Sequence, residues 1–116
     1  DSFVRVGQEL VDDYIGRNDY IGARDVIETN IMPTITRLKL AGRIIPVRSQ
    51  YAVVLAYCGA FDAADAEMAR LAPYEGGLEP RGQWELRNQR ALIAHLRKNP
   101  PPPQWQMSPK LGRPAR

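Results

Sequence analysis

The chain has 116 residues, of which 44% are apolar and 25% charged, and this size and composition fit one small globular domain. They exclude two independent domains and a fully disordered chain. The net charge of +3 is far below that of a dedicated nucleic-acid-binding domain. The charge is also unevenly distributed. Residues 1–70 hold eight basic and ten acidic side chains, whereas residues 71–116 hold eight basic and three acidic side chains.

The single cysteine and the single histidine limit the chemistry of the chain. A single cysteine excludes an internal disulfide bond. One cysteine and one histidine cannot form a zinc site without several carboxylates, so we expect no metal and no cofactor. The longest apolar stretch, residues 51–57, is much shorter than the roughly 20 residues that cross a bilayer. Because the chain begins with Asp1 rather than Met, we expect a processed form or a piece of a longer protein.

Helical periodicity predicts two helices in the first 42 residues. A first helix, over residues 3–15, has apolar residues at spacings of three and four: Phe3, Val6, Leu10, Val11, Tyr14 and Ile15. Asp19 is the expected N-cap of a second helix over residues 20–31. Pro33 predicts a kink or a restart, after which the helical pattern continues until Gly42, a typical C′ residue.

The second half of the chain predicts three further helices. A proline indicates a connector over residues 44–48, and a third helix follows over residues 49–58. A fourth helix is expected from Asp62, as N-cap, to Pro73, and a last one over residues 81–98, with apolar positions at Trp84, Leu86, Leu92, Ile93 and Leu96. Strand alternation persists nowhere, so the predicted fold class is all-α with about five helices.

Two of the expected helix pairs share a pattern of residues 41 positions apart. In this pattern Tyr14, Asn18, Tyr20, Ala23 and Ile27 match Leu55, Gly59, Phe61, Ala64 and Met68. In each pair, a residue that tolerates left-handed backbone geometry ends the first helix, and an aromatic residue follows two positions later. A small alanine three residues further on lets the second helix approach the first closely.

The segment over residues 51–71 resembles one unit of a tetratricopeptide repeat. Ala52 stands at the small position of the first helix, Gly59 at the turn glycine, Phe61 at the turn aromatic and Ala64 at the small position of the second helix. The resemblance extends over residues 3–72, with a period about seven residues longer than the roughly 34 of the family. The alternative is an unrelated helical bundle whose turns use the same residues.

The resemblance implies antiparallel helix hairpins, stacked side by side in one domain over residues 1–98 with the last helix as a cap. Such repeats bind another protein or a peptide in a concave groove, and a second copy of the chain is a further possible partner. We therefore predict a protein-interaction module. The groove candidates are residues of the first helices of each pair that packing does not use: Gln8, Asp12, Arg48, Gln50 and Val53.

The proline-rich and basic tail over residues 99–116 has a different character. Four consecutive prolines from Pro100 to Pro103 end the last helix and favour a polyproline II conformation. The tail either docks on the helices or recruits a partner, and the residues that would do so are Pro101, Pro102, Trp105 and Met107.

An alternative function follows from the basic C-terminal helix and tail, which could associate with nucleic acid. Residues 112–114 (Gly-Arg-Pro) resemble the core of AT-hook peptides, although Leu111 stands where those peptides have a second arginine. Because such a tail neutralises few phosphates, protein binding is the preferred interpretation.

The sequence argues against an enzyme. It contains no phosphate-binding glycine loop, nucleophile elbow or metal motif. Asp12 and Asp13 diverge by about 100° on a helix and form no acid/base pair. Cys58 lies on an apolar helix face, and His95, near the basic end of the last helix, has no evident partner group.

Overall fold

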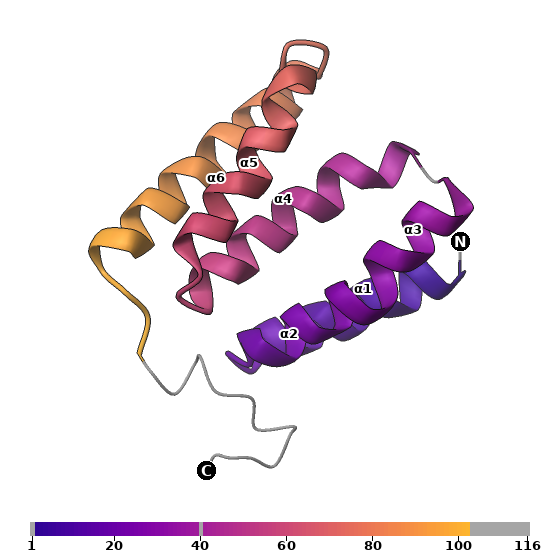
Figure 1. Cartoon of the computed structure of the whole chain (residues 1–116), viewed down its shortest axis with the longest axis horizontal. Coiled ribbons are helices and arrows are strands. Elements are labelled where there is room, and N and C mark those ends of the chain that lie inside the picture. Colours follow the sequence, from indigo (N-terminus) through magenta and orange to yellow (C-terminus); the bar gives the residue numbers. More distant parts are fainter. Residues whose placement is uncertain (1, 40, 103–116) are drawn as a thin grey trace.

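The computed structural model describes residues 2–39 and 41–102 (Figure 1). The first part contains α1 (Ser2–Gly16), α2 (Tyr20–Val26), the π-helical turn η1 (Ile27–Ile31) and α3 (Met32–Leu38). Since α2, η1 and α3 follow one another without a gap, they form one rod that runs beside α1.

The second part contains α4 (Ala41–Tyr57), α5 (Phe61–Glu75) and α6 (Pro80–Lys98). Helix α4 lies between the two groups, with contacts to α2 and α3 on one side and to α5 and α6 on the other (Figure 1). All regular structure over the described residues is helical, which confirms the all-α prediction.

The two short turns have the predicted backbone geometry. Asn18 and Gly59 both adopt positive φ angles, of 58° and 82°, and each lies two residues after the end of α1 or α4. The N-cap is also confirmed, because the Asp19 carboxylate accepts a hydrogen bond from the Gly22 N–H at 2.9 Å. In each of the two turns, only three residues separate one helix from the next.

Small residues allow the helices to approach one another closely. The side chains of Ala23 and Ala64 are both fully buried, in agreement with their proposed spacing role. A Cβ atom on Gly22 would lie 2.6 Å from the Tyr14 ring, and one on Gly7 would lie 2.8 Å from Ile31, so neither position has room for a larger residue.

The prolines interrupt the helices less than the sequence suggested. Before Pro33 the helix widens into η1, and the Met32 N–H donates a hydrogen bond to the Ile27 carbonyl, five residues earlier. Helix α3 then follows directly. This π-helical turn is the local form of the expected kink or restart. The predicted connector over residues 44–48 is wrong, because Pro46 lies inside α4.

Three predicted helix ends also need correction. Helix α3 ends at Leu38, and the next residue, Lys39, provides the left-handed cap with a φ of 55°, while Gly42 is already in α4. Ala60, and not Asp62, is the N-cap of α5. Asp62 lies in the first turn of α5, where an acidic side chain interacts favourably with the helix dipole. Pro73 lies inside α5, which continues to Glu75.

Two hydrophobic clusters form the core and share α4. The first joins α1, α2, η1 and α3 to Val47 and Val54 of α4, and the second joins α5 and α6 to Ala52, Leu55 and Ala56 of α4. Opposite faces of one helix therefore hold the two halves together.

Three residues placed on apolar faces by the sequence are exposed. Val6 and Leu10 are 54% and 44% exposed, since α1 turns Val4 and Val11 inward instead, and Trp84 of α6 is 56% exposed.

Candidate functional site

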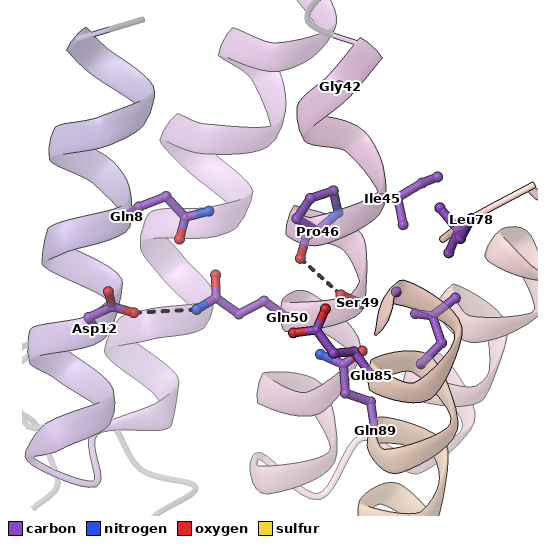
Figure 2. Close-up of a pocket in the computed structure, with 12 residues that line it drawn as sticks. Gln8, Asp12, Gly42, Ile45, Pro46, Ser49, Gln50, Leu78, Glu85 and Gln89 are labelled. Atoms are coloured by element: carbon purple, nitrogen blue, oxygen red, sulfur yellow. Dashed lines mark hydrogen bonds between the residues drawn. The ribbon is translucent and has the colours of Figure 1, made fainter. Parts of the chain in front are cut away.

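A groove of about 700 Å³ lies between α1, α4 and α6 (Figure 2). We call it the central groove and define it by its twelve lining residues: Gln8, Asp12, Gly42, Ile45, Pro46, Ser49, Gln50, Leu78, Gly82, Glu85, Leu86 and Gln89. Helix α1 supplies one wall, α6 and the residue Leu78 before it supply the other, and α4 lies between them.

Part of the groove surface is apolar. Ile45 and Pro46 of α4 lie opposite Leu78 and Leu86, and Leu86 belongs to the second core cluster. Pro46 has no N–H group to donate to the carbonyl of Gly42, four residues earlier, so the helical bonding pattern of α4 lacks one donor beside the groove. The Ser49 hydroxyl is turned to the backbone and donates to the Pro46 carbonyl at 3.0 Å.

The charges in the central groove are all negative. Its two ionisable side chains are Asp12 on α1 and Glu85 on α6, and no Lys, Arg or His is among the twelve described residues that line it. The Gln50 amide reaches from α4 towards α1, where its Nε2 atom is 3.5 Å from the Asp12 carboxylate (Figure 2).

Two amide oxygens in this groove lack hydrogen-bond partners. Gln50 Oε1 and Gln89 Oε1 are both buried, and neither accepts a hydrogen bond from any described residue. A buried acceptor without a donor costs roughly 1–3 kcal/mol of desolvation free energy. The central groove thus combines apolar contacts with a surplus of hydrogen-bond acceptors.

The structure brings three of the five groove candidates together. Gln8, Asp12 and Gln50 all line the central groove, on α1 and α4. Val53 is half-buried one turn further along α4 and does not line it.

Arg48, another groove candidate, points to a different side of α4. Its Nη1 atom donates to Glu67 of α5 at 2.7 Å. Arg48 also lines a second hollow of about 630 Å³, together with Ile44, Ile45, Arg70, Leu71 and Tyr74.

Sequence reasoning missed the contribution of the last helix. Glu85 and Gln89 are four residues apart, so they lie on one face of α6, and Figure 2 shows both projecting from α6 on the groove side. The available signal was the spacing of four residues, which places these two polar side chains on one face of α6. The two side chains of α6 reach the groove only because α6 packs beside α4, and this packing is not evident from the sequence.

The predicted tail residues fall at the limit of the described chain. Pro101 is buried and Pro102 is exposed. Trp105 and Met107 lie outside the described residues, so docking and recruitment both stay predictions.

The two residues considered for catalysis lie away from the groove. Burial in the first cluster raises the pKa of the Cys58 thiol to about 11, although nearby Arg24 acts in the opposite direction. His95 is exposed near the end of α6, 3.5 Å from the Asn99 amide. Over the described residues, no group of three His, Cys, Asp or Glu side chains is placed to hold a metal ion.

The basic side chains of α6 are partly engaged by acids of α5. Arg90 donates to Glu75, and Arg97 donates to Asp62 and Asp65. Hydrogen bonding to Glu75 raises the pKa of Arg90, and the same bond lowers the pKa of the Glu75 carboxyl. These pairs connect α6 to α5 and reduce the free positive charge of the last helix.

Comparisons with protein-family models, curated proteins and solved structures give no match to this chain. Within the described part of the chain, no helix has both the length and the apolar character that a membrane span requires. The geometry of the central groove is therefore the feature of this chain that bears on its function.

Proposed function

We propose that this chain is a protein-interaction module that binds a segment of a partner protein in the central groove. The observation that carries the proposal is the pair of buried, unpartnered oxygens of Gln50 and Gln89 beside the apolar side chains of the same groove. A peptide supplies what this surface lacks, because its backbone N–H groups donate hydrogen bonds and its side chains cover apolar area.

The arrangement of the helices supports a tetratricopeptide-like stack. Helix α1 pairs with the α2–α3 rod, α4 pairs with α5, and contacts of α4 with both α2 and α6 link one pair to the next. Asn18 and Gly59 provide the left-handed turn in each pair. In this interpretation α6 caps the stack, and α1, α4 and α6 supply the concave wall that such repeats use for binding.

A groove-filling substitution tests this function. We would select binding peptides from a displayed random library and compare Gly42→Trp with Gly76→Trp. A Cβ atom meets nothing within 4 Å at either glycine, so a side chain can leave the backbone at both positions, but only Gly42 lines the central groove. Circular dichroism of both variants verifies that each is folded. The selected peptides should lose at least about tenfold in affinity, or roughly 1.4 kcal/mol, for Gly42→Trp and keep it for Gly76→Trp.

Two results would contradict the proposal. One is a selection that enriches no peptide against the folded protein. The other is a set of peptides whose affinity is the same for Gly42→Trp and for the unmodified chain, because such peptides bind outside the central groove.

A further inference from the structure

We infer that the segment bound in the central groove carries an arginine side chain next to an apolar residue. This inference rests on the proposed function and adds the chemistry of the ligand to it. It follows from the charges, the hydrogen-bond acceptors and the apolar surface of the groove.

The charges of the groove call for a cation. Asp12 and Glu85 stand on its opposite walls, on α1 and α6, and no basic residue lines the groove to neutralise them. Neither carboxylate has a described salt-bridge partner, whereas other acids such as Asp13, Glu28 and Glu67 are paired with arginines. A cation between the two walls would be attracted by both carboxylates, and an acidic ligand would be repelled by both.

The hydrogen-bond acceptors favour arginine among the possible cations. Besides the two carboxylates, the groove has the unpartnered amide oxygens of Gln50 and Gln89. A guanidinium group has five N–H donors in a plane and no acceptor, so it can serve several of these oxygens at once. Lysine has three donors on one strongly hydrated atom, and neutral side chains supply fewer donors still.

The apolar surface of the groove requires a second contact from the same segment. Ile45 and Pro46 on α4 and Leu78 before α6 line the groove beside its polar residues. An aliphatic or aromatic neighbour of the arginine would cover these side chains, and the methylene stem of the arginine would add to the apolar contact.

The second hollow has the opposite electrostatic character. It is lined by Arg48 and Arg70, which share the single carboxylate of Glu67 and leave one positive charge in excess. Of these two hollows, the second therefore repels an arginine of a partner segment and the central groove attracts it.

Three displayed nonapeptide libraries test the inference. They are randomised at all positions except the centre, which is fixed as Arg, Gln or Glu. The Arg library should give binders at least about tenfold tighter than the other two, since a hydrogen bond to a charged group contributes roughly 1.5–3 kcal/mol. Their affinity should fall as salt is raised from 50 to 500 mM.

A matched pair of glutamate variants places the arginine. Glu85→Gln should weaken the Arg peptides by at least about tenfold, whereas Glu79→Gln, just outside the groove at the start of the same helix, should leave their affinity within about twofold. Circular dichroism of both variants verifies that each is folded.

The outcomes separate the inference from the function on which it rests. The arginine inference would be overturned if Gln or Glu peptides bound more tightly than Arg peptides and the Gly42→Trp substitution abolished their binding. The interaction function would then still stand. Arg peptides that are insensitive to Glu85→Gln would overturn the inference as well. If no library gives binders that depend on Gly42, or if sedimentation shows that a second copy already fills the groove, the peptide-binding function fails and the inference with it.

Discussion

At the scale of single residues, burial sets the chemistry of Cys58. This side chain is only 9% exposed and packs in the cluster between the α2–α3 rod and α4. Desolvation raises the pKa of its thiol from 9.0 to about 11, more than the nearby Arg24 guanidinium can offset. At neutral pH the group is a small apolar side chain rather than a nucleophile.

This raised pKa predicts a pH dependence of stability. The folded state favours the protonated thiol, so the stabilisation is complete below pH 9.0 and is lost as the pH rises to about 11. The full difference corresponds to about 3 kcal/mol at most. Urea denaturation at pH 7, 9 and 11 measures the free energy of unfolding. Its decrease with rising pH should be smaller for Cys58→Ala than for the unmodified chain.

The same series contains its own control. Tyr20 and Tyr51 also have pKa values raised by burial, and both remain in the Cys58→Ala variant. Their contribution to the loss of stability at high pH therefore cancels in the comparison. Equal losses for the two proteins would contradict the assignment to Cys58.

At the scale of helices, one buried carboxylate connects α4 to α5. Glu67 is 6% exposed and accepts hydrogen bonds from Arg48 of α4 and from Arg70 of its own helix. The Arg48 side chain is 29% exposed, whereas the Arg70 side chain is 59% exposed. The two arginines are therefore unequal partners of the same acid.

This difference predicts unequal effects of two alanine substitutions. Arg48→Ala should lower the free energy of unfolding by roughly 1–3 kcal/mol, because it leaves a buried carboxylate with only an exposed partner. Arg70→Ala should cost less than about 1 kcal/mol, as is usual for an exposed ion pair. Chemical denaturation measures the free energy of unfolding of both variants. A larger decrease for Arg70→Ala than for Arg48→Ala would show that the ion pair of Arg48 with Glu67 contributes little.

At the scale of the whole molecule, α4 makes the two core clusters depend on each other. Val54 belongs to the cluster with α1, α2 and α3, and the adjacent Leu55 belongs to the cluster with α5 and α6. Neither cluster can lose α4 without exposing the apolar residues that pack on it. The described helices should consequently unfold in one cooperative transition.

Leu55→Ala tests this cooperativity. Truncation of a side chain that is 2% exposed should cost roughly 2–5 kcal/mol. If the clusters are coupled, hydrogen exchange should accelerate in α1 as much as in α6, although Leu55 is in the cluster with α6. Val53→Ala, at a half-buried neighbour, is the control with a smaller effect, and faster exchange confined to α5 and α6 would contradict a single cooperative unit.

Local features of this protein could be predicted from its sequence where the cause is itself local. The Asp19 cap, the left-handed positions Asn18 and Gly59 and the buried spacers Ala23 and Ala64 depend on backbone geometry within a few residues. The all-α class follows in the same way from periodicity. The helix ends near Pro46 and Pro73 were wrong because neighbouring helices stabilise the segments that a proline weakens.

The central groove was decided by the tertiary structure. Gln8, Asp12 and Gln50 could be named from their helical positions, but Arg48 rotates towards Glu67 and away from them. Glu85 and Gln89 enter only because α6 packs beside α4. A sequence specifies which face of a helix is polar. Only the packing of helices distant in the chain determines which polar faces meet, and here it brings two carboxylates and two unpaired amide oxygens into one groove.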